Sequence, residues 1–309
     1  MCPFESFVVK LDIIANMEDI STNNNRATLL AVLAHPDDES FGMGGTLALY
    51  AQQGVAVHLV CATRGEVGEV EAERLEGYGS IAELRQNELR CAAGKLGLAG
   101  VHFLDYRDSG MAGSENNRHP QALANAPLEE VAGKVVHYIR KLRPQVVVTF
   151  DPIGGYRHPD HIAMHKATVE AFHKAGDSLA YPGDLPPYQP KKLYYHTMPR
   201  RIMRWAVRLM PLFGVDPRRW GINGDVDLTA VVNEDFPVHA RIDYREVQER
   251  KIAASECHAS QGGPILSRGP LRWAFRLAAG KDNFIRAYPP AEPGLRERDL
   301  FAGVNGSGE

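Results

Sequence analysis

Two short segments of the sequence combine histidine with carboxylate residues, HPDDE at 35–39 and HPDH at 158–161. Each segment holds two candidate metal ligands three residues apart, namely His35 and Asp38 in the first and His158 and His161 in the second. This spacing brings side chains together in a turn or in the first turn of a helix. Zinc accepts histidine nitrogen and carboxylate oxygen, and a catalytic zinc has three protein ligands and one water. Two histidines and one carboxylate from these segments would complete such a site.

A metal of this kind suits the hydrolysis of an amide. Zinc lowers the pKa of bound water from about 15.7 to about 7, which makes hydroxide available at neutral pH. Asp37, which stands beside a candidate ligand, could accept the proton of that water. The histidine that does not bind the metal could donate a hydrogen bond to the oxyanion, which contributes roughly 3 kcal/mol. Fe(II) also binds two histidines and one carboxylate, so the ligand set does not by itself select zinc.

Strands and helices alternate over the first half of the chain. The run ATLLAVLA at 27–34 is continuous and apolar, as in a strand that is buried on both faces. Further strands are expected at 55–63, 101–105 and 145–150, and helices at 80–97, 127–144 and 161–176. This order predicts an α/β fold with a Rossmann-like, doubly wound and mostly parallel sheet. Both histidine segments follow expected strands, and sites in such sheets form at the carboxyl ends of the strands.

The alternation loosens after about residue 176, and we expect four parts in the chain. Residues 1–26 form a flexible N-terminal extension, in which Met17 could be the true start. Residues 27–180 form the Rossmann-like catalytic core, and residues 181–300 form a smaller, more variable C-terminal part that completes the fold and the substrate pocket. Residues 301–309 form a disordered tail.

The histidine segments and their neighbours carry a resemblance to a known family. AHPDDE at 34–39, together with GGYRHPDH at 154–161, resembles the PIG-L/LmbE family of zinc-dependent N-acetylglucosaminyl deacetylases. That family includes deacetylases and amidases of mycothiol and bacillithiol metabolism. The resemblance covers residues 27–175 well, and the paired motifs are far more specific than either HPD triplet alone.

The resemblance implies which residues would bind the metal and which would be the base. His35, Asp38 and His161 would bind the zinc, and Asp37 would be the general base. Glu39 could cap the helix that follows the motif or brace the metal ligands, and the sequence does not choose between the two.

The resemblance also implies roles around the second motif. His158 would stabilise the tetrahedral intermediate and protonate the leaving amine, and Asp160 would orient His158. Tyr156 would assist the oxyanion. The residues that the resemblance places in the substrate pocket are Arg64, Glu66, Asp108 and His258.

The family implies a hydrolase that removes the N-acetyl group of an N-acetylglucosamine-type substrate, a small-molecule amino-sugar conjugate. One alternative is a thiol-conjugate amidase of the same family, which acts on a larger acyl group. Another is a non-catalytic, metal-containing sugar-binding protein. Asp37 and His158 argue against that alternative, because a binding protein needs neither a base nor an acid.

Composition bears on the partners and on the location of the protein. The net charge of −3 does not favour nucleic acid, which binds basic domains. No apolar stretch reaches the roughly 18 residues of a membrane span, so we expect no transmembrane segment. The N-terminal segment lacks the basic start and the cleavage site of a signal peptide, which favours the cytoplasm.

The cysteines Cys2, Cys61, Cys91 and Cys257 are far apart and include no CxxC pair. They therefore indicate neither a zinc ribbon nor a disulfide framework. Cys61 lies in an apolar run and Cys91 in a helical pattern, so both are expected to be small core residues. Unpaired cysteines again favour a reducing cytoplasm.

Two later segments are basic and amphipathic. Arg204 and Arg208 in the first, and Arg272 and Arg276 in the second, stand at helical spacing beside a tryptophan. They favour either a solvated helix face or a basic rim that holds an anionic substrate or lies on an anionic membrane surface. Peripheral membrane contact is therefore open, and the sequence does not indicate an oligomeric state.

Overall fold

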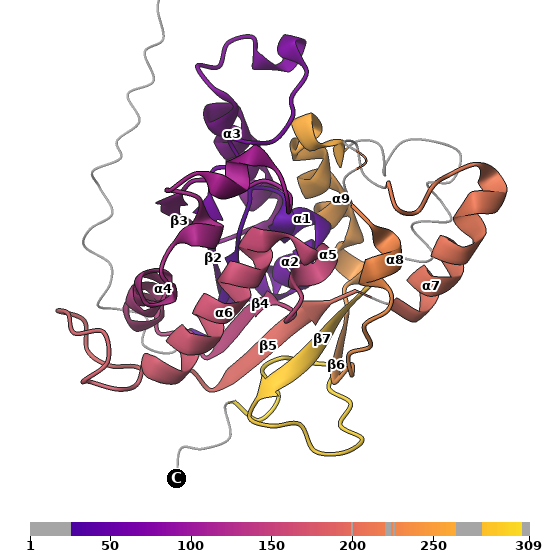
Figure 1. The fold of residues 1–309 in the computed structure, drawn as a ribbon. Helices are drawn as coiled ribbons and strands as arrows, with labels where there is room; N and C mark the ends of the chain where they lie inside the picture. The colour runs from indigo at the N-terminus through magenta and orange to yellow at the C-terminus, as the bar shows by residue number, and fades with distance from the viewer. Residues whose placement is uncertain (1–25, 199, 220–223, 225, 264–279, 305–309) are drawn as a thin grey trace, which may run out of the picture.

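The computed structural model describes residues 26–198, 200–219, 224, 226–263 and 280–304. Within these residues a seven-stranded sheet has the order β3-β2-β1-β4-β5-β7-β6 (Figure 1). Its strands are β1 (Thr28–Leu33), β2 (Ala56–Thr63), β3 (Gly100–Tyr106), β4 (Val146–Phe150), β5 (Lys192–Thr197), β6 (Ala240–Asp243) and β7 (Lys281–Tyr288). Strands β1 to β5 pair in parallel, whereas β7 is antiparallel to β5 and β6. The expected α/β fold with a mostly parallel sheet is confirmed.

Helices cover both faces of this sheet (Figure 1). The described α-helices are α1 (Asp38–Phe41), α2 (Gly44–Gln52), α3 (Ile81–Leu96), α4 (Leu128–Leu142), α5 (Gly154–Arg157), α6 (Pro159–Lys174), α7 (Arg200–Leu209), α8 (Leu228–Val231) and α9 (Gln248–Cys257). The short 3-10 helices are η1 (Ala72–Leu75), η2 (Glu115–Arg118), η3 (Leu123–Asn125), η4 (Met210–Phe213), η5 (Arg245–Val247) and η6 (Ala259–Gln261). Helix α4 packs against α6 on one face, and α3 packs against α9 on the other.

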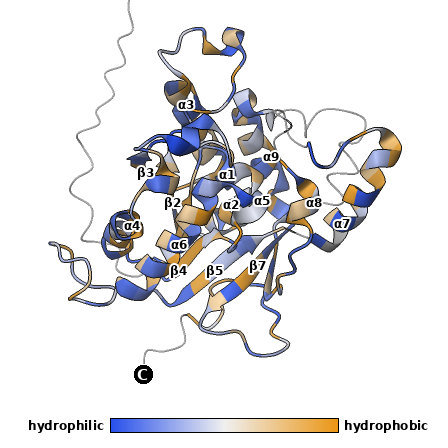
Figure 2. Ribbon diagram, viewed as in Figure 1, coloured by the Kyte–Doolittle hydropathy of each residue, from blue (hydrophilic) through white to orange (hydrophobic). Residues whose placement is uncertain are grey.

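The central strands are apolar along their whole length because both faces of the sheet are covered. Every residue of β1, TLLAVL, is buried, and so is every residue of β4, VVVTF. The hydrophobic colour of β4 is plain in Figure 2. β-branched residues such as those of β4 pack well on a pleated surface. These two strands therefore form a rigid base for the residues that follow them.

The C-terminal part continues the same sheet instead of forming a separate body. Strands β5, β7 and β6 extend it beyond β4, and Phe284 of β7 is buried in the same core as Leu29 of β1. The carboxylate of Asp282 accepts hydrogen bonds from the backbone N–H and the hydroxyl of Thr46, at 2.9 and 2.7 Å. The boundary expected near residue 180 is thus crossed by one sheet and one core.

The end of the chain folds further than expected. Phe301 is 9% exposed, and its ring lies 5.3 Å from that of Tyr50, centroid to centroid. Residues 301–304 therefore belong to the described structure. The start of the tail was expected too early, at residue 301, because Phe301 packs into the core. The extension expected at 1–26 lies outside the described residues except for Arg26.

The cysteines also differ from the expectation. Cys91 on α3 and Cys257 at the end of α9 form a disulfide, with a Cα–Cα distance of 5.8 Å. The expectations of no disulfide and of a core position for Cys91 were wrong, because α3 directs this exposed residue toward α9 and away from the sheet. Cys61 is free and buried, as expected. The cysteines therefore no longer support a reducing compartment.

The first basic segment forms α7 at the edge of the molecule (Figure 1). Figure 2 shows that this helix contains both hydrophilic and hydrophobic residues. Arg204 donates to a backbone carbonyl of the neighbouring loop at 2.7 Å. Trp205 is 66% exposed, and the guanidinium of Arg208 lies 5.6 Å from its ring centroid. Arg272 and Arg276 lie outside the described residues. Among the helices that the structure describes, none is long and apolar enough to cross a membrane.

Candidate active site

The two histidine segments meet at the carboxyl ends of β1 and β4, which are neighbours in the sheet. The chain passes from β1 outward to β2 and β3 and then returns to β4 on the other side of β1, so the strand order reverses here. Doubly wound sheets bind ligands at such a point. The first segment turns directly from β1 into α1, and the second opens α6, with Pro159 in its first turn.

Three side chains of these segments face one another. His35 Nδ1 lies 3.2 Å from His161 Nε2 and 3.5 Å from Asp38 Oδ2, and His161 Nε2 lies 3.2 Å from Asp38 Oδ1. All three side chains are at most 9% exposed. Ligand atoms at 2.0–2.1 Å from a tetrahedral zinc are about 3.3 Å apart. The chemistry and the spacing of these atoms therefore fit a metal ion of that size.

His158 belongs to the same cluster of imidazoles. A ring nitrogen of His158 lies within 4.8 Å of ring nitrogens of both His35 and His161. Its Nδ1 accepts a hydrogen bond from the backbone N–H of Asp160 at 3.2 Å, which caps α6. Burial holds the pKa of His158 well below its usual value, and the neighbouring imidazoles act in the same direction. The neutral ring of His158 can therefore donate a hydrogen bond from Nε2, its other nitrogen.

The carboxylate of Asp160 contacts a different histidine from the one expected. Its Oδ2 lies 3.1 Å from His35 Nε2 and accepts the backbone N–H of Ser109 at 2.9 Å. Asp160 bonds to His158 through its backbone N–H and not through its carboxylate. The expectation that this carboxylate orients His158 therefore needs correction, because the first turn of α6 directs the side chain toward β1. A carboxylate on the far nitrogen is a common way to orient a metal-binding histidine.

Asp37 lies beside the cluster in a strained backbone conformation, with φ at 128°. Such a conformation costs about 1–3 kcal/mol for a residue other than glycine and needs support from its surroundings. The Asp37 N–H donates to Glu39 Oε2 at 3.0 Å, and Arg85 donates to Asp37 Oδ2 at 2.8 Å. Burial raises the pKa of Asp37 to about 6, although the Arg85 guanidinium opposes this.

Arg85 is the residue of the site that the sequence did not predict. Its guanidinium lies under the first motif and also donates to the backbone carbonyls of Pro36 and Gly65, at 2.6 and 2.8 Å. Its helix, α3, buries Leu84, Arg85, Glu88 and Leu89 on one side. A charged pair inside an apolar helical stripe is rarely buried without a partner. That pattern is the signal that could have identified Arg85.

Tyr156 stands over the cluster on a tight glycine turn. Its ring centroid lies 5.0 Å from that of His161 and 5.9 Å from that of His158. The turn depends on Gly154 and Gly155, each with φ at 65°, a region that glycine adopts readily. A Cβ on Gly154 would lie 2.8 Å from the Cβ of His161, so the glycine lets the turn pack closely against α6.

Three of the four residues expected to bind substrate lie on the loops after β2 and β3. Asp108 is 4% exposed, and its Oδ1 lies 3.6 Å from His35 Nε2. Glu66 accepts the backbone N–H of Asp108 at 3.0 Å. Arg64 forms an ion pair with Asp105 at 2.6 Å. Arg64 and Glu66 both line an open cavity of about 550 Å³ at the end of β3.

The fourth residue, His258, is not among the residues that line this cavity. It is 0% exposed, and its Nε2 lies 2.7 Å from Glu39 Oε1. The expectation that His258 binds substrate was wrong, because the end of α9 turns its ring inward against α1. Glu39 is likewise 0% exposed, and the second oxygen of its carboxylate holds the Asp37 N–H. Glu39 therefore braces the first motif from below.

Most of the chain is similar in sequence to known enzymes. A family model described as GlcNAc-PI de-N-acetylase (PIG-L) matches residues 30–172. The 1D-myo-inositol 2-acetamido-2-deoxy-α-D-glucopyranoside deacetylase of Acidothermus cellulolyticus is 39% identical over 302 residues, which covers 90% of this chain and 95% of that relative. The chain belongs to the PIG-L family. The family expected from the two motifs is thus confirmed.

Solved structures show how widely the PIG-L fold is used. The N,N'-diacetylchitobiose deacetylase of Pyrococcus horikoshii matches with a TM-score of 0.57 at 20% identity, covering 85% of each chain. The 4-carboxy-2-hydroxymuconate hydratase of Pseudomonas putida KT2440 matches with a TM-score of 0.56 at 20% identity, covering 87% of this chain and 99% of that one. One of these proteins is a deacetylase and the other a hydratase. At this identity the likeness shows the fold alone.

We expect Gly65→Ala to lower kcat by about 10- to 100-fold through a small displacement of the site. Gly65 has φ at +66°, and a Cβ there would lie 2.1 Å from Arg85 Nη1. The guanidinium would have to leave the Asp37 carboxylate, while the candidate metal ligands would stay in place. Steady-state kinetics and metal analysis of the purified variant measure both effects.

The matched control is Gly94→Ala on α3, where an added Cβ meets nothing within 4 Å. That variant should keep the kcat of the unmodified protein. If Gly65→Ala keeps it as well, the contact between Arg85 and Asp37 does not matter for turnover.

Proposed function

We propose that this protein hydrolyses the N-acetyl amide of an N-acetylglucosamine-type substrate and releases a free amine and acetate. The observation that carries the proposal is the convergence of His35, Asp38 and His161, with the Asp37 carboxylate alongside. The Acidothermus relative supports the substrate class, because its name describes a 2-acetamido glucoside of myo-inositol. A glucosaminide with a polyol aglycone is therefore the leading candidate.

We assign His35, Asp38 and His161 as the metal ligands and zinc as the metal. The spacing of their facing atoms supports the assignment, and the Asp160 carboxylate behind His35 would fix the orientation of that ring. When bound, zinc supplies a Lewis acid that polarises a carbonyl and lowers the pKa of water. Fe(II) is the alternative metal for this ligand set, and metal analysis of protein purified without oxygen decides between the two.

Asp37 is the group that we expect to take the proton of the attacking water. Arg85 binds its Oδ2 at 2.8 Å and holds the carboxylate in one orientation, so Oδ1 is the oxygen that we assign to the proton. The pKa of about 6 leaves the carboxylate ionised at neutral pH. A base with a pKa close to the working pH accepts and releases a proton with little penalty in either direction.

His158 and Tyr156 are the donors that we assign to the oxyanion. Nδ1 of His158 accepts the Asp160 N–H, so the neutral ring carries its hydrogen on Nε2. That nitrogen would hydrogen-bond the oxyanion. A neutral imidazole is far too weak an acid to protonate the leaving amine, so we assign that step to Asp37, which would pass on the proton that it takes from the attacking water. The Tyr156 ring lies within 6 Å of the His158 ring and would add a second donor from its hydroxyl. One such donor lowers the barrier by roughly 3 kcal/mol.

We assign substrate contacts to the loops after β2 and β3. Arg64 and Glu66 line the cavity at the end of β3. Asp108 does not line it, but its backbone N–H donates to Glu66 at 3.0 Å and its carboxylate lies 3.6 Å from His35. Carboxylates and guanidinium groups hydrogen-bond the vicinal hydroxyls of sugars and polyols. The cavity is therefore our candidate for the part of the substrate beyond the acetamido group.

The proposed function is tested with a panel of N-acylated amino sugars and reconstituted protein. We expect amine release from an N-acetylglucosaminide of inositol, loss of activity with chelator, and recovery when zinc is restored. Faster release of a larger acyl group from a thiol conjugate would instead favour the amidase alternative. Sugar binding without amine release from any member of the panel would favour the non-catalytic binding protein and refute the proposal.

We also infer peripheral contact of α7 and η4 with an anionic membrane surface. Trp205, Leu212 and Phe213 are 66%, 77% and 81% exposed, and Arg208 accompanies them. Exposed apolar side chains beside cations suit the interface of such a membrane. Co-sedimentation with anionic vesicles should fall for Phe213→Ser, and equal binding of both proteins would exclude the contact. The expected cytoplasmic location stays a prediction that cell fractionation checks.

A further inference from the structure

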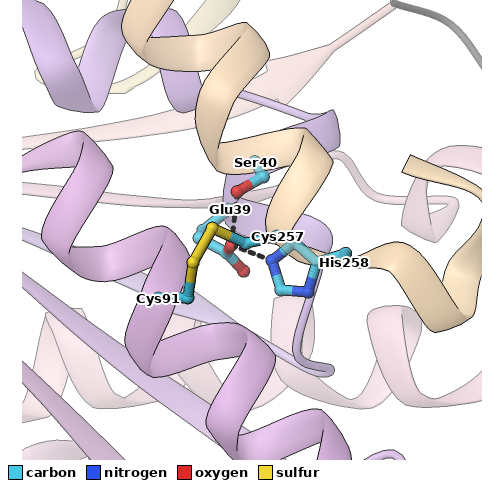
Figure 3. Close-up of a disulfide and its surroundings, with 5 residues drawn as sticks. All are labelled: Glu39, Ser40, Cys91, Cys257 and His258. Carbon is cyan, nitrogen blue, oxygen red and sulfur yellow. Dashed lines mark hydrogen bonds and ion pairs between the residues drawn. A yellow bond between two sulfur atoms is a disulfide. The ribbon is translucent and has the colours of Figure 1, made fainter. Parts of the chain in front are cut away.

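The disulfide joins the two helices that flank the first histidine motif. Cys91 lies on α3 and Cys257 is the last residue of α9, and their sequence separation is 166 residues. The two helices pack against each other on one face of the sheet. Figure 3 shows the disulfide bridging them directly beside Glu39 and His258.

From each half of the disulfide a short chain of contacts reaches Asp37. On α3, Arg85 precedes Cys91 by less than two helical turns and binds the carboxylate of Asp37 at 2.8 Å. On the other side, His258 directly follows Cys257 and binds Glu39 at 2.7 Å, and Glu39 accepts the Asp37 N–H at 3.0 Å. One helix thus holds the side chain of Asp37 and the other holds its backbone.

These contacts need the two helices in a fixed relative position. Asp37 adopts a φ of 128°, which the local sequence does not favour, so the support must come from its neighbours. Glu88 of α3 also binds the backbone N–H and the hydroxyl of Ser260, at 2.8 and 2.7 Å. This second link would keep the helices together without the disulfide, but with more freedom. Loss of the disulfide should therefore loosen the support of Asp37 without unfolding the protein.

The bond is also open to reagents, because Cys91 is exposed and Cys257 is half-buried. We propose that the Cys91–Cys257 disulfide, together with Glu39 and His258 as positioning residues, holds Asp37 in its active geometry, and that reduction of the bond by a dithiol lowers the rate of turnover. The inference rests on the proposed amide hydrolysis. It adds a redox-dependent control of the same site.

Reduction proceeds in two exchange steps. One thiolate of the dithiol attacks the Cys91 sulfur, the bond between the two protein sulfurs breaks, and Cys257 leaves as a thiolate. The second thiolate then attacks the reductant's sulfur in the mixed disulfide and releases Cys91. The reductant becomes a disulfide, and the protein gains two electrons and two protons.

The first test compares oxidised and dithiothreitol-reduced protein, with zinc content measured in both forms. We expect reduction to lower kcat by about tenfold, as for a small misplacement of a catalytic group. KM should change little, and reoxidation should restore kcat. The double variant Cys91→Ser and Cys257→Ser should show the lower kcat permanently and should not respond to dithiothreitol. Equal kcat in the oxidised and reduced protein would overturn the proposal, and so would an equal response of the serine variant, since that response would come from metal chelation.

The second test does not depend on activity. Amide hydrogen exchange is followed by mass spectrometry in the peptide that contains Asp37 and Glu39. We expect faster exchange in the reduced protein and in His258→Gln, because both loosen the acceptor of the Asp37 N–H. Unchanged exchange on reduction would overturn the inference even if kcat changed. If no substrate is hydrolysed in either redox state, the proposed function fails, while the exchange measurement still decides this inference.

Discussion

Asp37→Asn should lower kcat by about 10²- to 10⁴-fold, the usual contribution of a general base. Asparagine has nearly the same shape and keeps the backbone N–H that donates to Glu39. Its amide oxygen can still accept the hydrogen bond from Arg85, so the site should keep its geometry. An amide cannot accept a proton at neutral pH, and the variant therefore loses proton transfer alone. Single-turnover kinetics with the best substrate of the panel measure the loss.

Metal content separates the two roles that Asp37 could have. Asp38, not Asp37, has an oxygen 3.2 Å from His161 Nε2, so Asp37→Asn and Asp37→Ala should both bind metal as the unmodified protein does. Loss of metal from either variant would mean that Asp37 is a ligand, and the assignment of the base would then be wrong. Asp38→Asn provides the comparison, because it should lose metal affinity as well as turnover.

The fold and the metal-ligand candidates could be predicted because they depend on local signals. The buried strands β1 and β4 are continuous apolar runs, and each ends at a histidine motif. The topology of a doubly wound sheet then brings the two strand ends together, whatever the residues between them. His35 and His161 could therefore be placed at one point although 126 positions separate them in the chain.

The residues that were missed depend on how helices pack, which short motifs do not encode. Arg85 reaches Asp37, and Cys91 reaches Cys257, only because α3 packs against α9 beside the first motif. Asp160 could be paired with either histidine from its position in the sequence, and only the direction of the first turn of α6 selects His35. The same packing turns His258 away from the pocket.

One local signal was overlooked. A strand is expected from the sequence near residues 226–232, and this expectation was wrong, because the structure has the short helix α8 at Leu228–Val231. Its start is marked by Asp227, whose carboxylate accepts the backbone N–H of Thr229 at 2.8 Å. Aspartate is a preferred N-cap residue, so this boundary could have been predicted from the sequence.

Removal of one metal ligand should have the other large effect. His161→Ala takes away Nε2, which faces both His35 and Asp38. Substitution of residues that only orient metal ligands costs about 10- to 100-fold in metal affinity, so loss of a ligand should cost at least about 100-fold. Equilibrium dialysis against zinc measures this, and turnover at limiting zinc should fall in proportion to the metal bound.

Thermal unfolding gives an independent measure of the same site. A ligand that binds only the folded protein stabilises it by about 4.1 kcal/mol at a thousand times its Kd. Chelator should therefore lower the Tm of the unmodified protein but leave that of His161→Ala nearly unchanged. The control is His165→Ala, one turn along α6, where Nδ1 contacts the backbone carbonyl of Phe150 at 2.9 Å. That variant should bind zinc normally and still respond to chelator. If His165→Ala loses zinc and His161→Ala keeps it, the metal lies one helical turn away from the site proposed, and Asp37 is no longer beside it.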